Sequence, residues 1–593
     1  MCGILIVIRK NDSSLKKEAP SFHRALSNLR FRGPDYEFET YPHERLYFGQ
    51  TVLSLTGEFN KPSGDYLKSK SKRYQLAFNG EIYNYRAIKD KYQKLLFNMP
   101  DSKLTDSEVL VNLFDTLDSK EIADEIDGMY AYAVYDQKDR SVQISRDPQG
   151  EKTLYLFEDE KDIIIASDIK TILALRPSIK LNLNELKDYF STRHMMSVAR
   201  THFNGISQIL PGQTLSFSLD SSKWLTTNHL KVNSWIDPDR YYQNDKRSIE
   251  DLTDELDAIL TESFKEMIPT DREFASVLSG GVDSSLLSAY AVEFGNPKTL
   301  VAVNHIGKEQ ISHDLIAFEK ILNKKVNVVN VDAITYAGSI PKCQNALSGP
   351  IYSHSFVGQA LQSQYVRGLG CKAMFGGEGA DELFGGYSCY LDSYRRNINL
   401  PFSMSPYSTF SPSIKFDGYE HDEIKSELET IWQKALQAYS FVEDESERAA
   451  HAMMNCDLVH QVPAVGLRGA DLMSMMWSIE TRSVFLRRKL IKFGINLPMK
   501  FKADIKEKDD VFKTKKILKK LFVKKYNKDL LFKKQGFSGF PNESGAFLGN
   551  EKYFITPDIL KIPKNELINL DHSTAWKLIN MEYFLRNFSK YIP

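Results

Sequence analysis

The chain has 593 residues, more than one hydrophobic core normally serves, so we expect two or more domains. Lys and Arg number 77, as do Asp and Glu, and this zero net charge gives no electrostatic basis for binding nucleic acid or an anionic membrane surface. No apolar run approaches the roughly 20 residues that span a bilayer.

The cysteines indicate a reducing compartment. The five of them are scattered and form no CxxC pair or metal-ligand spacing, so neither a disulfide framework nor a zinc site is indicated. The twelve histidines form no HExxH-like pair, and we assign none of them a metal role. The opening run ILIVI is too short for a signal-peptide core and follows no basic segment. We therefore expect a cytoplasmic location.

The first part of the chain, up to about residue 225, favours a β-rich domain with short helices. Short strand-like runs alternate with turn residues. They are ILIVI (4–8), YQLAFNG (74–80), YAYAVYD (130–136), SVQIS (141–145) and DIIIAS (162–167). The run HRALSNL (23–29) has helical spacing.

The pattern changes after a polar stretch at 226–246, which we interpret as a linker. Residues 248–268 predict a long amphipathic helix, with Leu252, Leu256 and Leu260 at fourfold spacing. Buried strands then alternate with helices, which predicts a parallel α/β sheet, and the chain beyond residue 420 is mostly helical in pattern. We therefore divide the chain into domains at 1–225 and 247–593.

The strongest local motif is SVLSGGVDSS, residues 276–285. A strand-like run ends in Ser279-Gly280-Gly281, and a helix begins near Asp283. Glycines let backbone amides approach a phosphate, and a helix N-terminus favours negative charge. The motif is not GxxxxGK[ST], and it resembles the pyrophosphate loop of enzymes that adenylate a carboxylate or carbonyl oxygen. A glycine turn capped by aspartate and serine is the purely structural alternative.

A second motif, GGEGADELFGGY (376–387), places carboxylates where a strand-like run ends. The carboxyl ends of parallel strands are where α/β sheets bind ligands. Two roles follow: Asp381 as a Mg²⁺ ligand and Glu378 as a proton acceptor. A solvated acidic turn is the alternative.

These motifs, together with several others, are similar to those of the glutamine-hydrolysing asparagine synthetase family. The first half contributes MCGI, RFRGPD (30–35), FNGEIYNY (78–85), TDSEV (105–109) and SRDPQGEKTLY (145–155). The second half adds DLMSMMWSIETRSVFL (471–486) and FKTKKILKKLF (512–522) to the two loops above. The motifs occur in the family's order along almost the whole chain.

The resemblance implies the fold and the first site. It implies a four-layer αββα N-terminal-nucleophile domain, followed by a parallel-sheet domain of the adenine-nucleotide α-hydrolase type with a helical C-terminal extension. Cys2, exposed by removal of Met1, would attack the glutamine side-chain amide, with its own α-amino group as proton acceptor. Asn79 and Gly80 would form the oxyanion hole, and Glu81 and Asp106 would bind the glutamine amino group.

The resemblance also implies the second site and its cofactors, ATP and Mg²⁺. The ATP-binding residues would be Leu278, Ser279, Gly280, Gly281, Asp283, Ser284, Ser285, Gly377 and Glu378. Asp283 and Asp381 would hold Mg²⁺, Glu378 would act as base, and Lys515 would stabilise charge on the phosphate. Ammonia would travel through an internal tunnel, and a homodimer is implied by the family alone.

Three positions depart from the family pattern. Val52 stands where an arginine would grip the glutamine carboxylate, and Arg30 and Arg32 are candidate substitutes. His354 stands where an arginine would contact aspartate. The family's Pro-Phe-Leu-Asp segment is Val-Phe-Leu-Arg at 484–487, which we interpret as a charge reversal in the acceptor half.

The leading interpretation is a glutamine-dependent, ATP-consuming amidotransferase with aspartate as the default acceptor. One alternative is the same chemistry on another carboxylate, such as a uronic acid sugar in polysaccharide biosynthesis. A different class of alternative is a catalytically reduced relative that uses only ammonia or is not an enzyme. We expect small-molecule substrates and neither a nucleic-acid nor a membrane partner.

Overall fold

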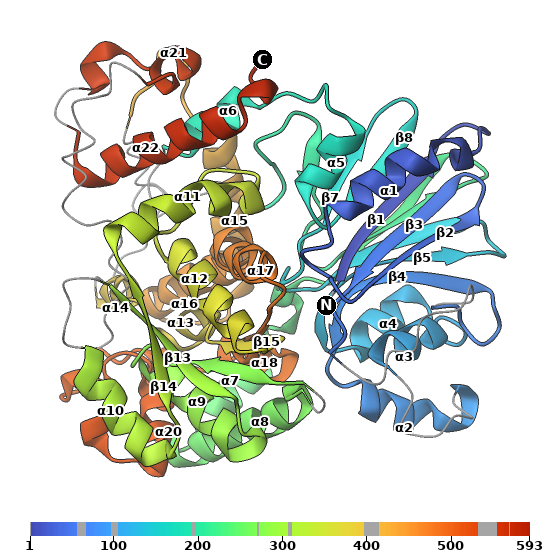
Figure 1. Ribbon diagram of the computed structural model, residues 1–593. Coiled ribbons are helices and arrows are strands. Elements are labelled where there is room, and N and C mark those ends of the chain that lie inside the picture. Colours follow the sequence, from blue (N-terminus) through green and yellow to red (C-terminus); the bar gives the residue numbers. More distant parts are fainter. Residues whose placement is uncertain are drawn as a thin grey trace.

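The computed structural model places two lobes side by side, one from each half of the chain (Figure 1). It describes residues 2–55, 67–96, 105–190, 197–269, 272–305, 311–395, 414–531, 554–567 and 570–593. The lobe of the first half contains two antiparallel sheets, and that of the second half contains one parallel sheet. The predicted mixed architecture is thereby confirmed.

The N-terminal lobe is built on a six-stranded and a five-stranded sheet. Their orders are β2-β3-β1-β8-β7-β9 and β11-β10-β6-β5-β4. The strands are β1 (Cys2–Arg9), β2 (Tyr36–His43), β3 (Leu46–Val52), β4 (Tyr74–Ile82), β5 (Gly128–Asp136), β6 (Ser141–Arg146), β7 (Tyr155–Glu158), β8 (Asp162–Ala166), β9 (Ile206–Gln208), β10 (Gln213–Ser218) and β11 (Lys223–His229).

The two sheets are stacked between helices, which makes four layers. Alternate residues of β1 point to opposite faces, so Ile4 and Ile6 join the core between the sheets while Leu5 and Val7 face outward. On that outer face lie α1 (Ala19–Ser27) and α5 (Ile169–Leu175). Helices α2 (Tyr85–Leu96) and α3 (Asp106–Leu113) cover the other sheet, near the short α4 (Ser119–Glu125). This layering fully buries β1, whose first residue is Cys2.

The C-terminal lobe has a five-stranded parallel sheet in the order β14-β13-β12-β15-β16. The strands are β12 (Phe274–Val277), β13 (Thr299–His305), β14 (Val326–Val331), β15 (Ala373–Gly376) and β16 (Glu480–Ser483). Helix α8 (Ile249–Met267) confirms the predicted amphipathic helix, with Leu252, Leu256 and Leu260 fully buried.

One helix from the first half of the chain and those of the C-terminal lobe complete the fold. They are α6 (Leu183–Asp188), α7 (Pro238–Asp245), α9 (Val282–Gly295), α10 (Ile311–Leu322), α11 (Ala333–Leu347), α12 (Ser355–Gly368), α13 (Ala380–Phe384), α14 (Ser388–Arg395), α15 (Asp422–Ala438), α16 (Glu445–Cys456), the π-helical η5 (Asp457–Gly466), α17 (Leu467–Met475), α18 (Arg488–Ile495), α19 (Met499–Lys502), α20 (Lys516–Lys525), α21 (Thr556–Leu560) and α22 (His572–Asn587). The stretch 226–246 holds the end of β11, a 3-10 turn and α7.

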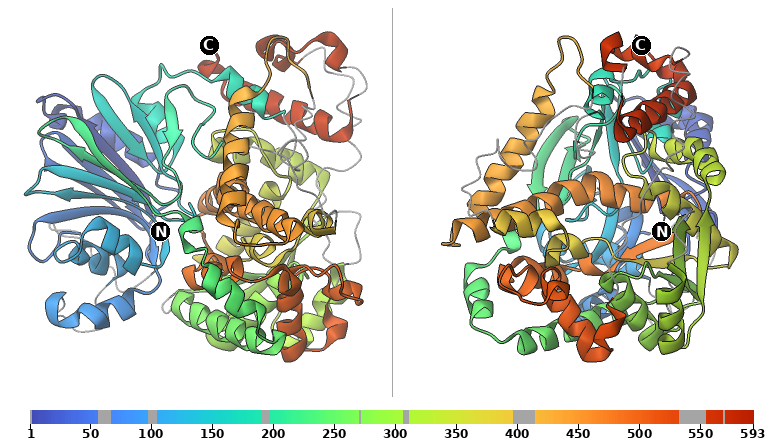
Figure 2. Two further views of the ribbon diagram at one scale, coloured as in Figure 1. Left: turned by 180° about the vertical axis from the view of Figure 1, so that it is seen from behind. Right: turned by 90° about the vertical axis from the view of Figure 1, so that its left-hand side faces the viewer.

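A buried ionic cluster joins the two lobes, which lie side by side in the left-hand view of Figure 2. Asp471 of α17 accepts hydrogen bonds from Arg32 (2.8 and 3.0 Å) and from the Thr153 hydroxyl (3.1 Å), and Lys152 lies 3.4 Å away. Burial opposes the charge of Asp471, but Arg32 and Lys152 outweigh it and hold its pKa below the usual range. The loop before β2 is thus fixed to the C-terminal lobe.

Arg487 belongs to a second junction between the lobes. Its guanidinium is buried, pairs with Glu266, lies 3.0 Å from Asp127 of the N-terminal lobe and sits over the Tyr83 ring. The neighbouring Arg488 donates to the carbonyls of Ala123 and Ile126 at 2.7 Å. The structure thus pairs the charge of Arg487 at the lobe boundary, and its interpretation as a charge reversal in the acceptor half stays a prediction.

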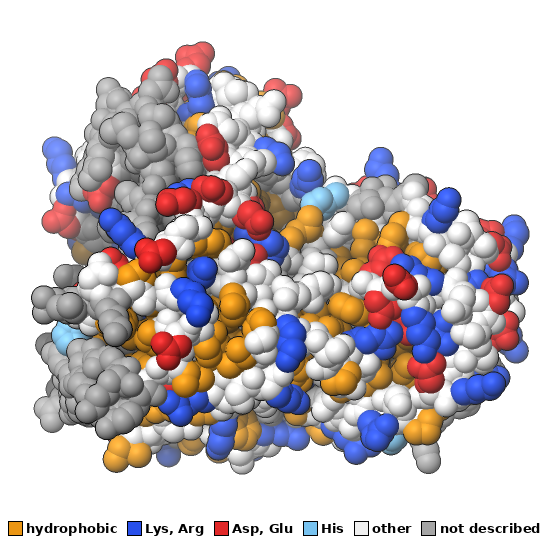
Figure 3. Space-filling view, turned by 90° about the horizontal axis from the view of Figure 1, so that it is seen from above, with side chains coloured by type: hydrophobic (Ala, Val, Ile, Leu, Met, Phe, Trp, Pro, Cys, Tyr) orange, Lys and Arg blue, Asp and Glu red, His pale blue; other side chains and the backbone are white. Residues whose placement is uncertain are grey.

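One face of the molecule shows how its charges are distributed. Figure 3 shows basic and acidic side chains interspersed over the face it presents. No helix among the described residues combines the length and apolar character needed to cross a membrane.

We expect Asp471→Ala to destabilise the junction of the two lobes by about 3–5 kcal/mol, because it leaves the buried Arg32 and Lys152 without a counter-charge. Thermal unfolding should begin earlier, and limited proteolysis should cut between the lobes faster. The matched control is Glu262→Ala, which breaks an ion pair with Lys489 whose two side chains are 49% and 53% exposed. That change should cost less than about 1 kcal/mol. Equal losses in both variants would contradict a structural role for Asp471.

Candidate active sites

The thiol of Cys2 lies buried at the start of β1. The Cys2 backbone nitrogen donates to Asn79 Oδ1 at 3.1 Å, and Gln50 Nε2 approaches the sulfur at 3.4 Å. Burial raises the pKa of the thiol above its ordinary value, although the Gln50 contact lowers it. A group of this kind needs a local proton acceptor to become a nucleophile. The predicted removal of Met1 concerns a residue outside those described.

Asn79 and Gly80 lie opposite Cys2 on β4. The Asn79 side chain is fully buried, and its Nδ2 is 3.5 Å from Ser167 Oγ, which also accepts from the Ile4 backbone nitrogen. A Cβ at Gly80 would stand 2.2 Å from the Met129 carbonyl oxygen, so no side chain fits there. The structure thus brings the predicted oxyanion-hole residues next to the predicted nucleophile.

Glu81 and Asp106 form a buried carboxyl pair beside this site. Asp106, in the first turn of α3, accepts from the Ile82 backbone nitrogen at 3.0 Å. Burial raises the pKa of both carboxyl groups, and for Glu81 the charge of Asp106 raises it further while Arg482 lowers it. A cation beside such a pair would stabilise the ionised carboxylates, and a ligand ammonium group would supply that charge.

Val52 sits directly across from Cys2 in the antiparallel pairing of β1 and β3. Of the two candidate substitutes, Arg30 is exposed and paired with Glu37 (2.7 Å), away from the thiol. Arg32 is fully buried, and its Nε donates to the Cys2 carbonyl at 3.3 Å. Its NH1 has no hydrogen-bond partner among the described residues. Arg32 is therefore the arginine that the fold places at this site.

The SGG turn connects β12 to α9 as predicted. The Ser284 hydroxyl closes it, accepting from the Ser279 backbone nitrogen and donating to the Gly281 carbonyl, both at 3.0 Å. Leu278 and Ser285 are buried, whereas Ser279 and Gly280 face outward, and a Cβ at Gly280 would meet nothing within 4 Å. The open glycine at the start of a 14-residue helix leaves room for an anion.

Three charged residues from distant parts of the chain meet beside this turn. The Lys515 ammonium pairs with Asp283 and lies 2.7 Å from Asp381. Burial opposes the Lys515 charge, but the two carboxylates outweigh it and raise its pKa. Asp381 approaches closely because Gly386 is a glycine, since a Cβ there would be 1.8 Å from Asp381 Oδ1.

This cluster suits a magnesium ion by its chemistry. Asp283 Oδ1 is buried and has no hydrogen-bond partner within the described ranges. Two carboxylates that share one cation, with an unsatisfied oxygen between the loops, are the hard oxygen ligands that Mg²⁺ prefers. The donor set of Asp283 and Asp381 therefore fits the predicted metal.

Gly377 and Glu378 follow β15 and lie against the same turn. A Cβ at Gly377 would be 3.7 Å from Asp283 Cβ, so the two glycine loops are in contact. The Ser483 hydroxyl donates to Glu378 Oε2 at a long 3.5 Å, and burial raises the pKa of this carboxyl group. A raised pKa suits a group that exchanges protons near neutral pH.

Strand β16 reaches both sites, which the sequence did not reveal. Arg482 NH2 lies 3.6 Å from Glu81, and its Nε donates to Glu480 at 2.6 Å. The next residue, Ser483, contacts Glu378. Arg482 and Gln50 were both missed as site residues, although Arg482 lies in a motif quoted for the resemblance and so had a signal.

Comparisons with known proteins agree with this geometry. A glutamine amidotransferase domain model matches residues 1–228, and an asparagine synthase model matches residues 255–557. The chain is thus a glutamine-dependent, ATP-using amidotransferase. It belongs to the asparagine synthase family, whose members are carbon–nitrogen ligases with glutamine as the amido donor.

The relatives are similar at modest identity. A putative asparagine synthetase [glutamine-hydrolyzing] 2 of Methanocaldococcus jannaschii is 26% identical over 438 residues, covering 67% of this chain and 78% of the relative. Asparagine synthetase [glutamine-hydrolyzing] 1 of Bacillus subtilis is 24% identical over 426 residues, covering 70% and 62%. A solved structure titled as the allosteric regulatory enzyme of purine biosynthesis has 12% identity, covers 56% of this chain and 80% of that one, and has a TM-score of 0.29, too low to support a conclusion.

The parent protein should lose stability as pH rises because Glu81 is buried. We expect Glu81→Gln, which has no ionisable group at this position, to be free of that loss. The raised pKa keeps the carboxyl group protonated in the folded state while the unfolded chain ionises near its reference pKa of about 4.3. Folding therefore loses stability as pH increases from the unfolded value toward the raised folded value. Unfolding measured at pH 5 and pH 8 should show the variant gaining most at pH 8. An equal difference at both pH values would contradict the raised pKa.

Proposed function

We propose that the chain hydrolyses glutamine at Cys2 and uses the ammonia to amidate a carboxylate that ATP has adenylated. Aspartate is the default acceptor, giving asparagine, AMP and pyrophosphate. The observation that carries this proposal is the position of β16, because adjacent residues of that strand contact Glu81 in one site and Glu378 in the other. Two sites held by one strand are suited to passing ammonia directly from the first to the second.

In the first site, the Cys2 sulfur attacks the carbonyl carbon of the glutamine side-chain amide. Its proton passes to the Cys2 α-amino group, whose reference pKa of about 7.7–8.0 suits neutral pH. Asn79 and the Gly80 backbone stabilise the oxyanion. The carbon–nitrogen bond then breaks, ammonia leaves with the returned proton, and water hydrolyses the thioester to glutamate.

The α-ammonium group and the α-carboxylate of glutamine are bound by different residues. Glu81 and Asp106 lie deep enough to ionise fully only when a cation arrives, so the substrate ammonium restores their charge. For the carboxylate we propose Arg32 in place of Val52, since Arg32 is already bonded to the Cys2 carbonyl. Its shared contact with Asp471 would tie glutamine binding to the position of the C-terminal lobe.

In the second site, the acceptor carboxylate attacks the α-phosphate of ATP and pyrophosphate leaves. The SGG turn and the α9 N-terminus bind the phosphates, and Asp283 and Asp381 hold Mg²⁺, which when bound neutralises charge on the pyrophosphate. Lys515 stabilises the negative charge that develops on phosphate. Glu378 accepts a proton as ammonia attacks the acyl-adenylate, which expels AMP and leaves the amide.

His354 bears on the choice of acceptor. His354, at the start of α12, packs against the Trp576 ring with 4.1 Å between ring centroids, and it lies 3.5 Å from the Tyr336 hydroxyl. An imidazole in this setting is a weaker partner for a second carboxylate than the family's arginine. This observation favours a carboxylate other than aspartate, such as a uronic acid sugar, as the second candidate.

Several expectations stay predictions. They are the cytoplasmic location, the homodimer, and the absence of nucleic-acid and membrane partners. The two matched domain models do not favour the alternative of an ammonia-only or non-enzymatic relative.

An acceptor panel tests the proposed reaction. Purified protein with ATP, Mg²⁺ and glutamine should release AMP and pyrophosphate when aspartate is added, with asparagine formed in equal amount. If AMP forms only with a uronic acid or another carboxylate, the aspartate assignment fails while adenylation stands. If no carboxylate yields AMP, the proposed reaction fails.

We expect Cys2→Ala to abolish glutamine-dependent turnover and leave ammonia-dependent turnover intact, because only the first site uses the thiol. Asp283→Ala should abolish turnover with either donor, since it removes a ligand of the second site. Amide formation is measured with glutamine and with ammonium chloride as alternative donors. Retained glutamine use in Cys2→Ala would contradict the assignment of Cys2 as the nucleophile. ATP turnover in Asp283→Ala would contradict the assignment of Asp283 as a metal ligand.

A further inference from the structure

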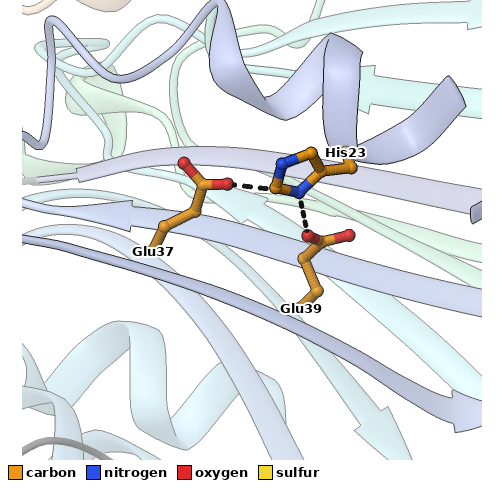
Figure 4. Close-up of side chains that lie close together, drawn as sticks. All are labelled: His23, Glu37 and Glu39. Atoms are coloured by element: carbon orange, nitrogen blue, oxygen red, sulfur yellow. Dashed lines mark hydrogen bonds and ion pairs between the residues drawn. The ribbon is translucent and has the colours of Figure 1, made fainter. Parts of the chain in front are cut away.

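Three side chains converge on the outer surface of the N-terminal lobe, away from the residues assigned to both sites. His23 comes from α1, and Glu37 and Glu39 come from β2 (Figure 4). His23 Nδ1 lies 2.5 Å from Glu39 Oε1 and 3.5 Å from Glu37 Oε1, and no two of the three donor atoms are more than 4.8 Å apart. We propose that His23, Glu37 and Glu39 bind a divalent metal ion of the zinc type.

The fold builds this convergence from residues far apart in the sequence. Glu37 and Glu39 are two residues apart on β2, so their side chains point to the same face of the sheet. Helix α1 lies over that face of the sheet. Strand β2 is the edge strand of the sheet, and His23 lies on the side of α1 that faces this strand. The three donors thus come from two elements that pack against each other.

Each carboxylate is oriented by a second donor behind it. The hydroxyl of Tyr47, a fully buried side chain, donates to Glu39 Oε2 at 3.0 Å. Arg30 Nε donates to Glu37 Oε2 at 2.7 Å, with a longer 3.4 Å contact from its NH2 to Oε1. In Glu39 the far oxygen is held and Oε1 faces the imidazole, whereas Glu37 Oε1 is shared between the imidazole and the Arg30 guanidinium. Outer contacts of this kind fix ligand orientation in metal sites.

The donor set selects the kind of ion. Zinc lies about 2.0–2.2 Å from nitrogen and carboxylate oxygen ligands, so donors on one ion are less than about 4.4 Å apart. His23 Nδ1 and Glu39 Oε1 are at hydrogen-bond distance, so admitting an ion requires small rotations of His23, whose side chain is 53% exposed, and of the two glutamate side chains. An imidazole favours zinc and similar ions, whereas magnesium prefers oxygen alone. Water would complete the coordination on the exposed side.

A bound ion would connect α1 to β2 and so close the segment between them. That segment contains Arg32, which bonds to the Cys2 carbonyl and to Asp471. The proposed ion is therefore structural, and it stabilises the edge of the lobe without taking part in chemistry. The inference does not depend on the proposed function, since it concerns the folded N-terminal lobe alone.

The test is zinc binding by the full-length protein after treatment with EDTA, measured by isothermal titration calorimetry. His23→Ala should bind the zinc equivalent of this site at least tenfold more weakly, and Glu39→Gln should do so as well. The control is Glu44→Gln, an exposed glutamate in the turn after β2, which should bind like the parent. Thiols are present in all variants, so binding at cysteines cancels in the comparison.

A second measurement separates a real site from a surface ion pair. Zinc should raise the melting temperature of the parent and of Glu44→Gln more than that of His23→Ala, because an ion that binds only the folded state stabilises it. Magnesium should affect all three proteins equally, because Asp283 and Asp381 are common to them. Identical zinc affinity in the parent and His23→Ala, or no saturable binding in the parent, would overturn the proposal and leave an ion pair.

Discussion

The contact between Arg32 and Asp471 is the constraint on which the arrangement of both lobes depends. Arg32 bonds to the carbonyl of Cys2 on one side and to Asp471 on the other, with both side chains removed from water. A buried charge without its partner is energetically unfavourable. Separating the two lobes would therefore leave Arg32 or Asp471 unpaired or expose it to water. The position of Cys2, the proposed nucleophile, is thereby fixed by contacts with both lobes.

Strand β16 extends the same principle to the two reaction centres. Arg482 is shared between Glu480 of its own strand and Glu81 of the other lobe, while Ser483 touches Glu378. Glu81 and Glu378 are thus connected through adjacent residues of one strand.

Much of this could be predicted from sequence because it is local. The period of three to four in α8, the strand runs and the SGG turn each follow from neighbouring residues, and the structure has them where expected. What could not be predicted is pairing across the chain: Lys515 with Asp283, Arg482 with Glu81, Asp471 with Arg32. Likewise, residues 23, 37 and 39 form no spacing motif, and only the packing of α1 against an edge strand brings them together.

Arg487 illustrates how a departure from a family pattern acquires meaning only in three dimensions. As a sequence change it is a reversal of charge in a segment associated with the acceptor. In the fold it faces Asp127 and Glu266, two carboxylates that would repel each other and any third acid at that position. The reversal is matched by the charges around it and belongs to the lobe boundary. Of the departures in the second half, His354 is the one that contacts residues of the C-terminal lobe, namely Trp576 and Tyr336, and it is therefore the one that the proposed choice of acceptor involves.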